Sequence, residues 1–299
     1  MDTVSHILFS CALARSELIP KSSDAEAIIV LSALIPDVDF IYRAKGIHQY
    51  FIHHRRESHS LIGLFALSLP LLAFAKFFTP ELSYPELYFF IWVGMLSHSF
   101  LDLLTVYGMP FLFPIQKRFF NLGILFVFDP WLDMLLLPAI FEKIIPLHKP
   151  DPARISLIAV FSYFIFLALL KITAQSQARK SFFEKLPEPD QVQIYVSPFF
   201  ALPFSWLLLL KHNHIIYRMR FSLIFGPGPI SIFKNEVSDQ LKESAEKSSL
   251  IKAIVKFSDF LFWQVIKQKS GYKILVNDLR FSQYNLGFHT ETEFNSEHE

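Results

Sequence analysis

The sequence has little cysteine, little glycine and few charged side chains. Cys11 is the one cysteine among 299 residues, so no internal disulfide can form. The formal net charge of +1 gives no global basic field, and we therefore expect no nucleic-acid partner. Charged residues make up 18% of the chain, below the roughly 25% of soluble domains. Hydrophobic residues make up 52% and include 34 phenylalanines, which indicates an integral membrane protein.

Long apolar runs account for this composition. Four of them are about 16 to 21 residues long, close to the roughly 20 needed to cross the hydrocarbon core of a bilayer. They cover residues 60–78, 87–107, 128–147 and 155–170. Two shorter runs, 4–20 and 25–36, are predicted to form a helical hairpin that dips into the bilayer. The sequence therefore predicts a mainly α-helical bundle of four spans with an N-terminal hairpin.

Basic residues are distributed unevenly among the loops. They are frequent in residues 41–58, in residues 108–121 and after residue 170, whereas the segments 79–86 and 146–151 contain at most one lysine each. Loops rich in lysine and arginine remain on the cytoplasmic side of a membrane. We therefore expect a multi-pass protein of the inner (plasma) membrane with a cytoplasmic C-terminus.

The character of the chain changes near residue 179. We expect a membrane-embedded helical domain over 1–178 and a small cytosolic domain, α+β or mainly β, over 179–299. Alternating and β-branched patterns predict strands, and a polar stretch predicts a helix at 231–256. The expected strands are 191–195, 214–223, 260–267, 272–276 and 279–284.

Residues 199–210 are apolar but short for a membrane span, and Pro203 lies inside them. An interfacial segment, a buried strand and a fifth crossing all remain open for this stretch.

Ionisable side chains interrupt the apolar part of the sequence. Such groups are costly inside a membrane and are candidates for function. His98 and Asp102 are four residues apart, so they share one face of a helix, and Asp2 and His6 have the same spacing. Two further clusters are Pro36-Asp37-Val38-Asp39 and His53-His54-Arg55-Arg56-Glu57-Ser58-His59-Ser60. The predicted topology brings all four clusters to the cytoplasmic side.

Each cluster also has a simpler interpretation. The basic residues at 53–56 could form an interfacial patch that contacts anionic lipid, and His98 with Asp102 could be a polar contact between helices. Convergence of four clusters at one membrane depth favours a metal site instead. Imidazole and carboxylate groups together suit zinc, manganese or iron.

The ordered set of these motifs resembles the YdjM-like inner-membrane proteins, a family of metal-dependent hydrolases. Ser5 and Ser58 stand where the family has threonine, which preserves the hydroxyl group. The resemblance covers most of the chain. The matching pieces are Met1-Asp2-Thr3-Val4-Ser5-His6, Pro36-Asp37-Val38-Asp39, His53 to Ser60, His98 to Asp102 with Tyr107-Gly108, Asp129-Pro130-Trp131, Gly271-Tyr272 and Asp278-Leu279-Arg280-Phe281.

That family is in turn distantly similar to zinc-dependent phospholipase C and the P1-type single-strand nucleases. This likeness implies a helical core of the phospholipase C/P1 nuclease type. Their ligand order is an early His, an Asp, a His, and then a His and an Asp four residues apart. The likeness therefore implies His6, Asp37, His59, His98 and Asp102 as metal ligands. The later histidine cluster of those enzymes has no match here, so we expect one or two divalent ions, most simply zinc, rather than three.

These observations together lead to a functional hypothesis. A bound metal ion would activate water and polarise a phosphoryl oxygen. Asp39 is a candidate general base or a partner that orients a ligand histidine, and Arg55 and Arg56 could hold a phosphate. The expected function is hydrolysis of a lipid-like phosphoester at the cytoplasmic membrane face, with membrane lipid as the main partner. The alternative is a non-enzymatic membrane protein with a structural or sensory metal site and a partner-binding C-terminal domain.

Overall fold

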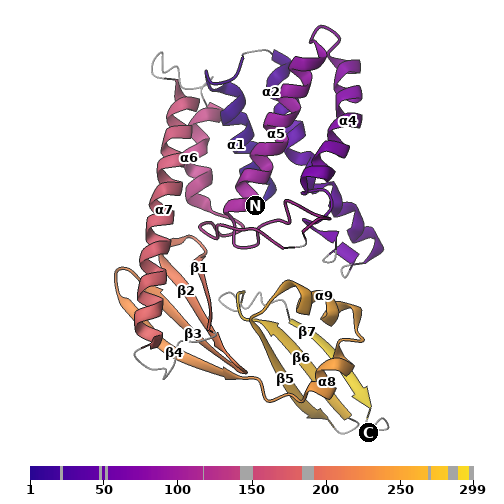
Figure 1. Cartoon of the computed structure of the whole chain (residues 1–299). Helices are drawn as coiled ribbons and strands as arrows, with labels where there is room; N and C mark the ends of the chain where they lie inside the picture. Colours follow the sequence, from indigo (N-terminus) through magenta and orange to yellow (C-terminus); the bar gives the residue numbers. More distant parts are fainter. Residues whose placement is uncertain are drawn as a thin grey trace. The chain divides into compact units, whose positions relative to one another are not determined.

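The computed structural model describes residues 1–20, 23–46, 49–50, 53–116, 118–141, 151–183, 192–268, 271–281 and 289–295. It divides into two compact units, Met1–Leu169 and Leu170–Glu299. The division falls inside the long helix α7 (Pro152–Phe183), which also contains the predicted domain boundary at residue 178. Helices make up the first unit, and strands dominate the second (Figure 1).

In the described part of the first unit, the elements before α7 are two N-terminal helices, a 3-10 segment and three further helices. The hairpin that the sequence predicts is formed by α1 and α2. The elements are α1 (Thr3–Arg15), α2 (Ser23–Leu34), η1 (Ile35–Lys45), α4 (Leu61–Phe78), α5 (Tyr84–Leu104) and α6 (Pro130–Ile140).

Three helices are long and apolar enough to cross a membrane, among the residues that the structure describes. They are α4, α5 and the Pro152–Phe182 part of α7, and each coincides with a predicted span. The remaining predicted span, 128–147, contains α6, which has only 11 residues. Residues 142–147 lie outside the described residues, so this crossing stays a prediction.

Helix α5 lies at the centre of the first unit. Ser83 and Glu86 form a capping box that fixes its start, and Thr105 ends it. Its buried side chains, such as Ile91 and Met95, pack in one core with residues of α2 and α4. Figure 1 shows α5 between its helical neighbours. The most buried of the three candidate spans is therefore also the one that contains the His98 and Asp102 pair.

The second unit contains two antiparallel sheets, ordered β1-β2-β3-β4 and β5-β6-β7. The helices α8 (Asp239–Ala245) and α9 (Ser249–Phe257) separate the sheets in sequence. The strands are β1 (Gln193–Phe199), β2 (Leu202–His212), β3 (Ile215–Ser222), β4 (Gly226–Lys234), β5 (Leu261–Gln268), β6 (Gly271–Asp278) and β7 (His289–Asn295).

The ambiguous apolar stretch 199–210 belongs mainly to the buried strand β2. Trp206, Leu208 and Leu210 pack in one core with Ala174 and Phe182 of α7. On the opposite face, Leu207 and Leu209 pack with Phe260 and Leu279. A strand that is buried on both faces needs apolar residues throughout, which explains the run without a fifth crossing.

Two predictions for the second unit are wrong in part. Residues 231–234 of the predicted helix 231–256 complete β4 instead, because they pair with β3. The rest of that helix is divided between α8 and α9, since the chain turns at residues 246–248.

The predicted strand 279–284 also fails where it is described. Leu279, Arg280 and Phe281 follow β6 as a turn because the Asp278 side chain accepts a hydrogen bond from the Arg280 backbone N–H at 3.0 Å. Residues 282–284 lie outside the described residues.

Candidate metal centre

His98 and Asp102 lie one helical turn apart on α5, and both are fully buried. The His98 Nδ1 lies 2.7 Å from the Ala33 carbonyl oxygen at the end of α2. A carbonyl only accepts, so Nδ1 carries the proton and Nε2 is the acceptor nitrogen of the neutral ring. The backbone contact therefore fixes both the orientation of the ring and its tautomer, as is common for metal-binding histidines.

Gly94, one turn before His98, permits this contact. A Cβ atom at Gly94 would collide with the Ile29 backbone oxygen of α2. Glycine therefore lets α2 approach α5 closely enough for the Ala33 carbonyl to reach His98.

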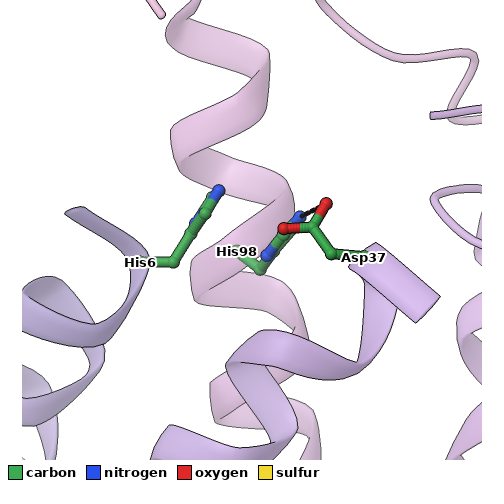
Figure 2. Close-up of side chains that lie close together, drawn as sticks. All are labelled: His6, Asp37 and His98. Carbon is green, nitrogen blue, oxygen red and sulfur yellow. Dashed lines mark ion pairs between the residues drawn. The ribbon is translucent and has the colours of Figure 1, made fainter. Parts of the chain in front are cut away.

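Three groups face the Nε2 of His98, and a fourth stacks on its ring. The His59 Nε2 lies at 3.1 Å, an Asp102 oxygen at 3.5 Å and an Asp37 oxygen at 3.8 Å. The His6 ring stacks on the His98 ring with centroids 3.7 Å apart. Figure 2 shows His6 from α1, His98 from α5 and Asp37 from η1 gathered in one place. The structure thus brings together all five ligands that the sequence suggested.

Within this cluster, two sets of three side chains can each hold a metal ion. They are His6, Asp37 and His98, and His59, His98 and Asp102, and in each set the ligand atoms lie within 4.8 Å of one another. Both ring nitrogens of His6 and Oδ2 of Asp102 are buried without a hydrogen-bond partner in the part of the chain that the structure describes. Buried polar atoms normally have a hydrogen-bond partner. Atoms that lack one, as these do, are candidates for binding a metal ion.

The cluster also perturbs the ionisation of its members. Burial alone would raise the pKa of Asp37, but the hydrogen bond to His59 and the nearby imidazoles outweigh it and lower that pKa well below its usual value. Burial alone would lower the pKa of His59, but the Asp102 and Asp37 carboxylates beside its Nε2 outweigh it and raise that pKa. Both shifts show that the imidazoles and carboxylates of the cluster stabilise one another's charged forms.

Asp39 lies beside the cluster and organises the loop that contains His59. Its oxygens accept hydrogen bonds from the Arg55 backbone N–H at 2.7 Å and the Ser58 hydroxyl at 3.2 Å. The His54 Nδ1 lies at 3.1 Å and the His59 Nδ1 at 3.5 Å. Burial would raise the pKa of Asp39, but the contact with His54 and the other donors outweigh it and lower that pKa. The Ser58 hydroxyl also lies 3.0 Å from the His59 Nδ1, so His59 is held between the Ser58–Asp39 pair on one ring nitrogen and the cluster on the other.

Arg55 and Arg56 point to different partners. The Arg55 guanidinium is buried, and its Nη2 lies 3.0 Å from an Asp102 oxygen. Arg56 pairs with Glu57 at 2.6 Å and lies over the Phe113 ring, away from the five ligands. The adjacent His53 likewise contacts Glu57, at 3.3 Å.

Some contacts of the site were not expected from the sequence. Thr105 lies 3.5 Å from a nitrogen of the Arg55 guanidinium, and the Tyr107 ring lies under that guanidinium. The Met1 amine pairs with Asp102. Met1 and Tyr107 belong to the pieces that resemble the YdjM-like family, which was the available signal for them, whereas Thr105 had only its closeness to Asp102 in sequence.

The fold and the site together define a helical membrane protein with a buried His/Asp cluster that can bind a metal ion. The YdjM inner membrane protein family matches residues 1–177, more than half of the chain, and the chain belongs to that family. Family membership and the three candidate spans support a location in the inner membrane.

Individual relatives agree with this assignment. The chain is 24% identical over 293 residues to the uncharacterized protein YfhP of Bacillus subtilis strain 168, covering 94% of this chain and 87% of YfhP. It is 32% identical over 143 residues to the inner membrane protein YdjM of Escherichia coli K12, covering 40% of this chain and 68% of that protein. The YdjM protein of Shigella flexneri matches to the same extent. No solved structure matches the chain.

Proposed function

We propose that this protein is a membrane-bound, metal-dependent hydrolase that acts on a phosphoester of a lipid-like substrate at the cytoplasmic membrane face. The observation that carries the proposal is the pair of ligand sets that share His98, with unsatisfied nitrogens on His6. The order of the five ligands along the chain, which resembles that of zinc-dependent phospholipase C, adds support from the sequence.

His6, Asp37, His59, His98 and Asp102 would hold one or two divalent ions. Zinc fits a donor set of imidazoles and carboxylates best, and manganese or iron is compatible with it. When bound, such an ion supplies an activated water and polarises a phosphoryl oxygen. Asp102 would contribute its Oδ2, which lies 3.5 Å from the His98 Nε2, whereas its Oδ1 pairs with the Met1 amine and with Arg55.

Asp39 serves as a positioning residue in this proposal. Three donors already occupy its oxygens. One of them, the Ser58 hydroxyl, lies 3.0 Å from the Nδ1 of His59, and the carboxylate itself lies 3.5 Å from that nitrogen, while the Nε2 of the ring faces the cluster. A carboxylate in this position fixes the tautomer of a ligand histidine and raises its basicity. This geometry favours the orienting role over the role of general base.

Arg55 is the better of the two candidate phosphate-binding residues. Its guanidinium is buried beside Asp102, and its Nε has no hydrogen-bond partner among the described residues. It can therefore donate to a phosphoryl oxygen next to the metal ligands. Arg56 is engaged by Glu57 and would contribute at most an indirect effect.

The burial of the cluster is also compatible with the alternative function, a structural or sensory metal site. Four of the five ligands are buried, and Asp37 alone is partly exposed, at 29% of its side chain. Structural metal sites are closed in this way, whereas catalytic sites keep an open position. Access to Asp37 is thus the feature on which catalysis depends.

Metal analysis and turnover of the purified full chain test the two functions together. We expect bound zinc, manganese or iron, and hydrolysis of a panel that contains a phospholipid, a polyprenyl phosphate and a bis-aryl phosphodiester. His98→Ala and Asp102→Ala should lose metal and turnover, while His214→Ala, at an exposed turn of the second unit, should keep both. Tight metal binding without turnover of the panel would favour the structural or sensory role, and absence of metal would refute both.

A further inference from the structure

Two neighbouring hairpins of the second unit present exposed apolar side chains at the same end of one sheet. The β1–β2 turn lies at residues 200–201, and the β3–β4 turn lies at 223–225. Ser205 of β2 pairs with Ser222 of β3, and the Leu223 backbone N–H donates to the Phe204 carbonyl at 2.9 Å, so the two turns lie side by side. The exposed apolar residues of this end, the hairpin tips, are Phe200, Leu202, Phe204, Ile224 and Phe225.

The tip of the second hairpin is an ordered turn. The Ser222 hydroxyl accepts hydrogen bonds from the backbone N–H groups of Ile224 and Phe225, at 3.2 and 3.3 Å. Gly226 follows with φ +78°, a conformation that glycine adopts without strain. The turn holds Ile224 at 66% exposure and Phe225 at 89% exposure. Large apolar side chains that are held outward together mark an interaction surface, unlike single exposed ones.

The charge of this sheet narrows the choice of partner. Residues 192–235 contain no aspartate or glutamate, whereas Lys211, Arg218, Arg220 and Lys234 are basic. Arg220 is the charged residue nearest the tips in sequence, and it is exposed, with its guanidinium 4.9 Å from the Phe199 ring centre. Lys211 and Lys234 lie at the opposite end of the sheet, so Arg220 is the basic residue beside the tips. Apolar side chains with a basic residue beside them are a combination that binds an anionic bilayer surface.

The sheet packs on α7, and the N-terminal part of that helix is a candidate membrane span. The charge-free stretch of α7 ends at Leu170, and Ala174 and Ala178 of the same helix pack against this sheet. At 1.5 Å per residue, Ala174 lies only about 6 Å along the helix from Leu170. Leu170 and Leu223 pack against the same core cluster. The sheet is therefore held close to the end of a span.

We infer that the hairpin tips insert into the anionic leaflet of the membrane that contains the helices, with Arg220 binding lipid headgroups. This contact would hold the second unit against the bilayer independently of any chemistry at the metal centre. It also explains why the apolar tips of this sheet lack acidic neighbours in sequence.

Site-directed spin labelling of the full chain in lipid nanodiscs tests this inference. Cys11, the one native cysteine, is replaced by alanine, and a nitroxide is attached at Phe225→Cys. The matched control is Ile266→Cys, an exposed apolar position of β5. In nanodiscs that contain phosphatidylglycerol, the label at 225 should be accessible to oxygen and protected several-fold from a water-soluble nickel chelate, while the label at 266 should remain open to nickel.

Other results of the same experiment would distinguish a lipid contact from a protein contact or from exposure to water. Equal nickel access at 225 and 266 would overturn the inference, and so would a label at 225 that is shielded from both oxygen and nickel, since that indicates contact with protein. Arg220→Gln, or nanodiscs of phosphatidylcholine alone, should weaken the protection at 225 several-fold. Unchanged protection in both would overturn the role of anionic headgroups.

Discussion

The two units of this protein distribute their polar and apolar side chains in opposite ways. In the first unit, His59, His98 and Asp102 are fully buried, while large apolar residues such as Phe77 and Ile165 are exposed. In the second unit, Trp206 and Ile274 are buried, and charged residues such as Asp239 are exposed. The same chain therefore contains one region built for lipid and one built mainly for water.

This difference indicates which side chains determine ligand binding and which determine stability in each unit. Apolar side chains that face lipid need no close packing against protein. The specific properties of the first unit therefore depend mainly on its buried polar cluster. The second unit depends on close packing of apolar residues around its sheets. Changes to the cluster should therefore affect ligand binding first, and changes to the second core should affect stability first.

The largest expected effect concerns the side of the membrane that each region faces. A reporter fused after Arg179 or placed near Lys45 should read cytoplasmic, and one near Ser83, before α5, should read external, because basic segments remain inside. Activity of paired cytoplasmic and external reporters measures this directly. A cytoplasmic signal at Ser83 would contradict the four-span arrangement.

The core of the second unit provides the next largest effect. Trp263 is buried among apolar residues of β6 and of the connecting helices, and its backbone N–H binds the Asn235 side chain at 2.9 Å. Trp263→Ala should lower the free energy of unfolding by about 3–5 kcal/mol. Metal content should not change. Thermal unfolding in detergent measures the loss, and Ile266→Ala, on the exposed side of the same strand, is the control; equal melting temperatures for both variants would show that Trp263 is not a core residue.

Gly94→Ala should affect stability and metal binding together, which no single change in the second unit should do. The added Cβ would meet the Ile29 carbonyl and push α2 away from α5, at a cost of about 1–3 kcal/mol. The Ala33 carbonyl would then no longer hold His98, and bound metal should fall. Melting temperature and metal content are measured on one preparation, with Leu96→Ala, an exposed position of α5, as the control. Destabilisation with full metal content would separate the helix contact from the site.

The sequence predicted the first unit better than the second, for physical reasons. A span such as α4 is recognised from its length and hydropathy. Ionisable residues inside apolar runs, such as His98 and Asp102, are easily recognised as functional candidates because their burial in a membrane costs free energy. In the second unit, β2 resembled a short span because burial on both faces produces the same continuous apolar run. The end of β6 depended on the local side-chain bond of Asp278, which a pattern of alternation does not reveal.

Long-range partners were the least predictable part of the site. The contact between Arg55 and Asp102 joins residues from distant segments, and no sequence pattern indicated which of Arg55 and Arg56 would face inward. Asp39 was recognised as a candidate, but its role could not be chosen until its contacts with Ser58 and His59 were known.

The smallest effect that we predict separates the two roles of Asp39. Asp39→Asn keeps the size of the side chain but removes the charge that faces the Nδ1 of His59, so metal affinity should fall about 10- to 100-fold, or about 1.4–2.8 kcal/mol. Competition with a fluorescent zinc chelator measures this affinity. The same exchange at exposed Asp259 should have no effect. A general base would behave differently, because its loss would abolish turnover of metal-loaded protein while metal affinity stayed at the wild-type value, and that result would replace the orienting role with a catalytic one.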